Sequence, residues 1–174
     1  MVYVIVLLIV VIVGVLAVAS RKPATLRLSR SAVIAAAPER VYPLLEDFHE
    51  WTKWSPWEDR DPNMTRTYTG AIRGVGAKYA WAGNRKAGSG SMEITDAKPS
   101  SDLTIALHFL KPFEAHNTTE FTLRPQGQMT EVTWTMSGDN TFASKLFSVF
   151  VSMDKLVGKD FEAGLAALKS VAER

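Results

Sequence analysis

Cysteine is absent from this chain of 174 residues, and histidine occurs only three times. Without a thiol the chain forms no disulfide, no thiolate metal site and no lipid attachment through cysteine. A cysteine nucleophile and a cysteine-bound iron–sulfur cluster are excluded for the same reason. The composition fits a reducing compartment.

A concentrated run of basic residues is also missing. The 20 Lys and Arg are scattered among 18 Asp and Glu, which leaves a formal net charge of +2. Nucleic-acid-binding domains usually gather their cations into one stripe, so we expect no nucleic acid partner. No Gly-x-Gly-x-x-Gly links a strand to a helix and no serine lies in Gly-x-Ser-x-Gly, which leaves nucleotide binding and a serine nucleophile unsupported.

The few residues able to bind a metal are not arranged for it along the sequence. His49, His108 and His116 show no ligand spacing such as His-x-x-x-His, so we expect surface histidines, with no metal and no cofactor. The acids Glu58, Asp59 and Asp61 are expected to be a solvated loop.

Charge is missing altogether from residues 1–20, which are almost entirely Val, Ile, Leu and Ala. Eighteen such residues form a helix of about 27 Å, enough to cross a hydrocarbon core of about 30 Å. We therefore expect a transmembrane anchor at 1–20, a linker at 21–24 and one domain at 25–174. The first cations, Arg21 and Lys22, follow the span and predict a cytoplasmic domain by the positive-inside rule.

A cleaved signal peptide is the alternative, because Ala17-Val18-Ala19 offers an A-x-A site. Against it, no Lys or Arg precedes the apolar run, which is also longer than usual for a signal peptide. A buried core helix is the third reading, and the uniform apolarity of every face argues against it.

Alternation of apolar and polar residues predicts an antiparallel sheet with one solvated face. A first strand is expected at 25–35 and a short helix at 36–48, disturbed by Pro43. Six further strands are expected at 64–69, 77–82, 89–97, 103–110, 114–123 and 130–137. Apolar residues at three- and four-residue steps then predict one long helix at 142–172, which Gly158 could bend and which lies on the sheet.

This order of elements is the α+β helix-grip, and two segments carry a family resemblance. Ile34-Ala35-Ala36-Ala37-Pro38-Glu39-Arg40-Val41-Tyr42 and Trp51-Thr52-Lys53-Trp54-Ser55-Pro56-Trp57 resemble the polyketide cyclase/dehydrase branch of the START-like (Bet v 1-like, SRPBCC) superfamily. Later stretches at 108–113 and 153–161 resemble bacterial members of the group that have an N-terminal membrane segment. The resemblance implies a cavity between the sheet and the long helix that holds an apolar or amphipathic ligand, such as a lipid, an isoprenoid or a polyketide-like molecule.

Counting along the predicted strands and helix gives the residues expected to line that cavity. They are Tyr79, Trp81, Met92, Ile94, Leu107, Phe109, Asn117, Thr119, Trp134, Met136, Phe150, Met153 and Val157. Asn117 and Tyr79 would supply the internal polar groups. Packing of the same residues into a dry core is the plainer alternative.

Three functions stay open at this point. The first is a membrane-tethered binding domain, and the second is a cyclase or dehydratase, for which Asp154 and Asp160 could reach the cavity mouth. The third is a protein-interaction module, like the chaperone activators that share the fold, with an unknown protein partner. Trp51, Trp54 and Trp57 either contact lipid headgroups or pack under the helix.

Overall fold

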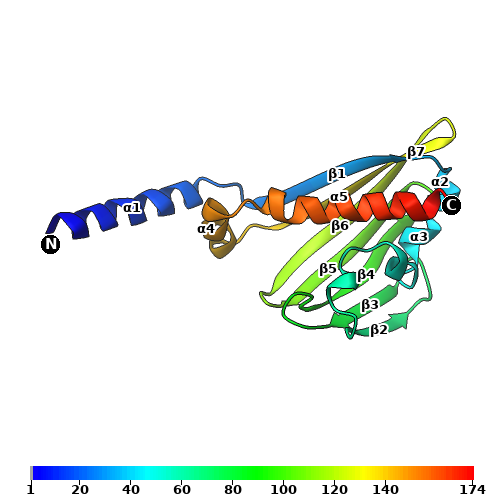
Figure 1. Ribbon diagram of the computed structural model, residues 1–174, viewed down its shortest axis with the longest axis horizontal. Coiled ribbons are helices and arrows are strands. Elements are labelled where there is room, and N and C mark those ends of the chain that lie inside the picture. Colours follow the sequence, from blue (N-terminus) through cyan, green and yellow to red (C-terminus); the bar gives the residue numbers. More distant parts are fainter. Residues whose placement is uncertain (1) are drawn as a thin grey trace.

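A curved antiparallel sheet of seven strands holds the long helix α5 in the computed structural model, which describes residues 2–174 apart from the side chains of residues 143, 153 and 156 (Figure 1). The strands, in the spatial order β1-β7-β6-β5-β4-β3-β2, are β1 (Thr25–Ile34), β2 (Thr65–Gly70), β3 (Ala77–Ala82), β4 (Ser89–Lys98), β5 (Asp102–Lys111), β6 (Ala115–Gln126) and β7 (Met129–Asp139). The helices are α1 (Val2–Ser20), α2 (Pro38–Val41), α3 (Pro43–Glu46), α4 (Phe142–Phe150) and α5 (Met153–Ala172), with short 3-10 turns η1 (Glu50–Lys53) and η2 (Glu58–Arg60). The predicted helix-grip is confirmed.

Alternation along the strands gives the sheet its two faces. On β5, Leu103 and Ile105 are buried, whereas Thr104 and Ala106 point the other way and are half-buried or exposed. The apolar side packs against α5, and we call it the inner face. The predicted strands therefore lie where their patterns put them, with bounds that differ by a few residues.

Pro43 divides the first helical segment, as its place in the sequence predicts. α2 ends at Val41, and Tyr42 keeps helical dihedral angles between the two helices. α3 then begins with Pro43 in its first turn, where a missing N–H costs nothing. Tyr42 and Leu45 are buried, so the two short helices close one end of the core.

The prediction of one continuous helix over residues 142–172 is wrong. Val151 is extended, and Ser152 begins a new helix by accepting a hydrogen bond from the backbone N–H of Lys155. Thr141 caps α4 in the same way. Gly158, the expected bend, lies inside α5. The apolar spacing continues through the break, so periodicity alone cannot reveal it.

Before this break, α4 lies off the sheet and packs against the end of α1, so it is found between α1 and α5 in Figure 1. Lys22 Nζ donates to the carbonyl oxygen of Ser148 at 2.6 Å, and Ala19 in the last turn of α1 is fully buried. The apolar residues of α4 therefore do not extend the stripe that α5 lays on the sheet.

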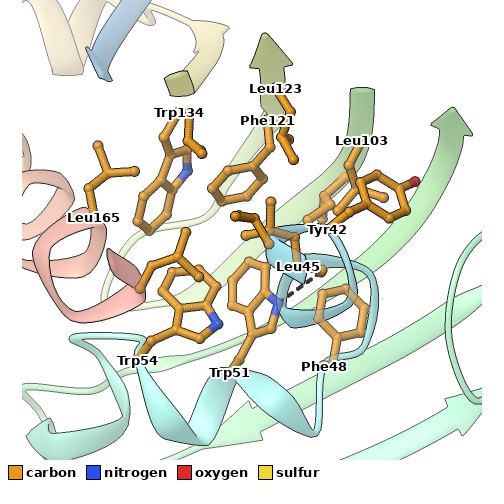
Figure 2. Packing of buried hydrophobic residues seen from close by; sticks show 14 of the residues in the cluster. Tyr42, Leu45, Phe48, Trp51, Trp54, Leu103, Phe121, Leu123, Trp134 and Leu165 are labelled. Carbon is orange, nitrogen blue, oxygen red and sulfur yellow. Dashed lines mark hydrogen bonds between the residues drawn. The ribbon is translucent and has the colours of Figure 1, made fainter. Parts of the chain in front are cut away.

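The tryptophan cluster lies in the core, which confirms packing and not headgroup contact. Trp51 and Trp54 are buried, and their indole N–H groups donate to the carbonyl oxygens of Leu45 and Leu44 (Figure 2). Trp57 packs edge-on against Trp134. Since these rings fill the space under the C-terminal half of α5, they make that half of the inner face dry.

An open end of the inner face as candidate functional site

Strand register places inner-face residues in rows that cross the sheet. Tyr79 pairs with Met92, Met92 with Leu107, and Leu107 with Asn117, which pairs in turn with Gly138. The next row contains Trp81, Gly90 and Phe109. These two rows lie at the end of the sheet where β1 begins after α1 and β7 leads into α4, and we call it the open end.

Burial falls along the strands toward this end. On β5, Ile105 is 0% exposed and Leu107 is 9% exposed, and Phe109 is only partly buried. On β7 the exposed fraction rises from 0% at Val132 to 8% at Met136. On β3 and β6 the same trend ends at Trp81 and Asn117, whereas on β4 Gly90 stays buried beside the Trp81 ring. The inner face is thus a closed core at one end and a partly uncovered apolar surface at the other.

Two glycines shape the open end by leaving room for neighbouring side chains. A Cβ on Gly90 would lie 2.5 Å from Trp81 Cη2, so the indole ring lies across the glycine. Trp81 then meets Phe109 edge-on at 5.8 Å, and its N–H donates to Ala87 O at 3.1 Å. The side-chain oxygen of Asn117 similarly occupies the space that a Cβ on Gly138 would need.

Most of the predicted cavity residues do share one face. Tyr79, Trp81, Met92, Leu107, Phe109, Asn117 and Met136 gather toward the open end, and Ile94, Thr119 and Trp134 lie deeper in the closed half. Val157 faces them from α5. Phe150 is on α4, apart from this group and 73% exposed, and the side chain of Met153 lies outside the described residues.

The carboxylate of Glu58, which the sequence predicted to be solvated, is nearly buried and supports one edge of this site. The Glu58 side chain is 9% exposed, accepts a hydrogen bond from the Tyr79 hydroxyl at 2.8 Å and pairs with Arg66 Nε at 2.6 Å. Burial first, and then this hydrogen bond, raises the pKa of Tyr79 above its ordinary value, so the phenol stays neutral. Asp61 is also buried and accepts from the backbone of Asn63 and Asn84, whereas Asp59 is exposed as expected.

The predicted acids on α5 fasten the helix instead of facing a ligand. Arg30 of β1 binds Asp154 at 3.0 Å and Glu162 at 2.8 Å, and its guanidinium crosses α5 where Gly158 leaves space. Asp160 pairs with Arg60 at 2.6 Å. Beside the first of these clamps a small hollow of about 30 Å³ lies between β1, β7 and the start of α5. That volume corresponds to about one water molecule.

The outer face of the sheet carries a wide groove of about 710 Å³, and its lining also includes Tyr79, Met92, Leu107 and Asn117 of the predicted cavity residues. Side chains of Lys78, Ser91, Glu93, His108 and Thr118 flank it, all on the side away from α5 by strand alternation. No described residue of α5 lines this groove, so it is not the predicted cavity between the sheet and the long helix.

Cross-strand pairing brings His108 and His116 together, although they are eight residues apart in sequence. Their rings stack at 3.9 Å, and Glu114 lies 3.2 Å and 3.8 Å from their Nε2 atoms. Ligand atoms of all three lie within 4.8 Å of one another. In the described part of the chain no hydrogen bond orients the remaining ring nitrogens, as a metal-binding histidine usually requires, and two of the three side chains are mostly exposed.

One buried donor in the closed half has no acceptor among the described residues, the indole N–H of Trp134. Its ring stacks on Phe161 at 4.2 Å. It also lies tilted against Phe121 at 4.9 Å (Figure 2). The site as a whole therefore offers apolar surface with a few neutral polar groups and, at one edge, the Glu58 carboxylate held by Arg66 and Tyr79. This composition suits binding of an apolar molecule better than acid–base chemistry.

Comparison with known proteins agrees with this geometry. Residues 25–173 match the family model described as polyketide cyclase / dehydrase and lipid transport. Protein CV1439 from Chromobacterium violaceum is similar, with a TM-score of 0.60 and 19% identity over 87% of this chain and 99% of that chain. The Aha1 dimer from Colwellia psychrerythraea gives a TM-score of 0.56 and 18% identity over 85% and 96%, and Ms6760 from Mycobacterium smegmatis gives 0.58 and 17% over 85% and 90%.

These solved structures share the fold at identities too low to carry function across. A search of curated protein sequences finds no match. The family model covers nearly all of the chain after α1, including every strand of the sheet and both of its C-terminal helices. The chain therefore belongs to the polyketide cyclase / dehydrase and lipid transport family, whose helix-grip fold supports binding of a hydrophobic ligand.

Proposed function

We propose that this protein is a membrane-anchored binding domain that takes one small apolar or amphipathic molecule, a lipid or isoprenoid, at the open end of the inner face. The observation that carries the proposal is the fall in burial along β3 to β7 toward Trp81, Phe109 and Asn117. When a ligand covers such a partly exposed apolar surface, the buried area stabilises the complex by about 25 cal/mol per Å².

Anchoring by α1 is the second part of the proposal. Residues Val2–Ser20 form a helix long and apolar enough to cross a bilayer, and nearly all of its surface is free of protein contacts. A signal sequence near the N-terminus would have the same composition, so the choice rests on the packing of α1 against α4 and on the burial of Ala19 in the last turn of α1. Because α1 joins β1 through four residues, the open end lies close to the bilayer that would supply the ligand.

The polar groups of the site favour a carrier or sensor over an enzyme. Asn117 and Thr119 are amides and alcohols without acid–base strength, and the Tyr79 hydroxyl already donates to Glu58. Asp154 and Asp160 are held in ion pairs on α5. These groups can orient a ligand headgroup by hydrogen bonds but hold no proton ready for transfer.

Photo-crosslinking in the full chain tests the binding proposal. The chain would be reconstituted in lipid nanodiscs with a diazirine-bearing fatty acid, irradiated and mapped by peptide mass spectrometry. We expect adducts on β5, β6, β7 and the first half of α5 in addition to those on α1. Adducts confined to α1 would show lipid around the anchor alone and contradict the binding site.

Two variants on neighbouring positions of β5 make the test specific. Phe109→Lys places a charge on the inner face at the open end and is expected to remove the adducts on β5 and β6. His108→Lys changes the outer face of the same strand and is expected to leave them unchanged. Equal loss in both variants would assign the adducts to general surface contact.

A further inference from the structure

The helix α4 has an apolar side that the protein does not cover. At 100° per residue, Phe142, Leu146, Val149, Phe150 and Phe147 fall on one side, and the other side consists of Ser144, Lys145 and Ser148. Phe142 is 53% exposed, Phe147 51% and Phe150 73%. Single exposed apolar residues are common on protein surfaces, but three exposed phenylalanines on one nine-residue helix form a patch. Such patches mark contact sites.

The position of α4 in the fold indicates what its apolar side contacts. It packs against the last turns of α1, the segment proposed to cross the bilayer, and Lys22 holds it there through Ser148. A helix beside the point where a span leaves the membrane lies at the depth of the lipid headgroups. Amphipathic helices at that depth bury their apolar side about 5–10 Å into the boundary with the acyl chains.

The sheet contributes a second apolar point at the same end of the molecule. The hairpin between β5 and β6 carries Phe113, 81% exposed, and Leu110, 51% exposed. The hairpin and α4 both lie on the side of the sheet toward α1 (Figure 1). Lys111 and the exposed Glu114 flank the tip of this hairpin, and Arg85 and Lys86 occupy the neighbouring loop between β3 and β4, so the cations near the apolar residues outnumber the acid.

We propose that α4, together with the tip of the β5–β6 hairpin, docks on the surface of an anionic bilayer and holds the open end of the inner face against it. The extended residues 151 and 152 separate α4 from α5, which lets the bilayer hold α4 while α5 stays clamped to β1 by Arg30. The proposal rests on the anchoring of α1 in the proposed function. It adds a route by which an amphipathic molecule passes from the membrane to Phe109 and Asn117 without crossing water.

Depth measurement with single cysteines tests the docking, since the natural chain has none. Full-length Phe150→Cys and its matched control Ser144→Cys, about 120° apart around α4 and on its apolar and polar sides, would each carry the environment-sensitive dye NBD. The chain would be reconstituted in vesicles of phosphatidylcholine and phosphatidylglycerol that contain a nitroxide-labelled lipid. Leu8→Cys, inside α1, reports insertion of the anchor.

The proposal expects strong nitroxide quenching and blue-shifted emission at position 150, with little of either at position 144. Quenching at position 8 together with none at position 150 would overturn the docking while leaving α1 in the membrane. No quenching at position 8 would overturn the anchoring and the docking together. Equal quenching at 144 and 150 would show α4 sunk into the acyl region, which also contradicts a surface helix.

Vesicles of phosphatidylcholine alone separate the contributions of charge and apolar surface. We expect the quenching at position 150 to fall when phosphatidylglycerol is omitted, and Lys145→Glu to cause the same fall in its presence. Full quenching at position 150 both without phosphatidylglycerol and in Lys145→Glu would show that docking does not need anionic lipid, which contradicts that part of the proposal. A protein partner in place of the bilayer would appear as blue-shifted emission at position 150 without nitroxide quenching, which would likewise overturn it.

Discussion

At the scale of single residues, Gly90 determines how Trp81 lies on the inner face. A Cβ at this position would meet Trp81 Cη2 and the His108 carbonyl oxygen, each at 2.5 Å. We expect Gly90→Ala to displace the indole and lower the free energy of unfolding by about 1–3 kcal/mol, the usual cost of overpacking. Denaturant titration followed by tryptophan fluorescence measures it, with Ser91→Ala on the outer face as control, expected to stay within about 0.5 kcal/mol.

Tyr79 and Tyr68 form a matched pair for the hydrogen bond to Glu58. The Tyr79 hydroxyl donates to a nearly buried carboxylate, whereas the Tyr68 hydroxyl has no hydrogen-bond partner among the described residues. Hydrogen bonds to charged groups contribute about 1.5–3 kcal/mol. We therefore expect Tyr79→Phe to lower the free energy of unfolding by about that amount and Tyr68→Phe to change it by less than about 0.5 kcal/mol. Equal effects would assign the loss to removal of a tyrosine hydroxyl in general and not to the hydrogen bond with Glu58.

The buried phenols predict loss of stability in alkali. Burial raises the pKa of Tyr42 to about 12, and it also raises the pKa values of Tyr68 and Tyr79. The unfolded chain releases these protons near pH 10, before the folded chain does, so the free energy of unfolding falls as pH rises from about 10 to 12. Urea midpoints across this range measure the fall, and Tyr42→Phe should make it less steep. An unchanged slope in Tyr42→Phe would mean that other groups cause it.

At the scale of elements, the division between α4 and α5 depends on Ser152. Its hydroxyl accepts from the Lys155 N–H, and removal of such a cap costs about 1 kcal/mol. We expect Ser152→Ala to speed amide hydrogen exchange in the first turn of α5 and leave the rest of that helix protected. Ser170→Ala, on an exposed position of the same helix, is the control. Slower exchange through residues 150–155 would instead indicate that the two helices have fused.

The strands were predictable because alternation is a local signal that burial of one face imposes directly. Tyr79, Met92, Leu107 and Asn117 could be assigned to one face in this way, and the register confirms it. The break at Val151 could not be predicted, since α4 and α5 are each amphipathic with compatible spacing. What separates the two helices is the identity of their partners, α1 and the sheet, which no local pattern encodes.

Long-range pairing explains the other differences. Glu58 lies in an acidic loop of the sequence, and only the folded chain shows that Arg66 and Tyr79 bury it. His108 and His116 meet because a hairpin turns between them. In contrast, the sequence allowed the tryptophan cluster to lie either at lipid headgroups or in the core. The contact of the Trp51 ring with Phe121 places it in the core (Figure 2). Sequence thus predicted the surface of the site better than the groups that support it.

At the scale of the whole molecule, sidedness and processing decide which compartment the open end faces. Arg21 and Lys22 directly follow the proposed span, and the positive-inside rule predicts that they and the domain behind them face the cytoplasm. Cleavage after Ala19 would remove the helix that α4 packs against and leave the apolar side of α4 without α1. We therefore expect the intact mass of the membrane-extracted protein to include residues 2–19.

A single cysteine on α5 reports the compartment, because the chain has no other thiol. Ser170→Cys is exposed and lies far along the chain from both α1 and α4. A membrane-impermeant maleimide should label it in inside-out bacterial vesicles but not in intact cells with permeabilised outer membranes. Labelling in those cells, combined with an intact N-terminus, would show that the domain faces outward and that the anchor is retained. Since the cations at 21 and 22 would then lie on the disfavoured side, that outcome would contradict the predicted orientation alone and leave the binding surface at Phe109 unaffected.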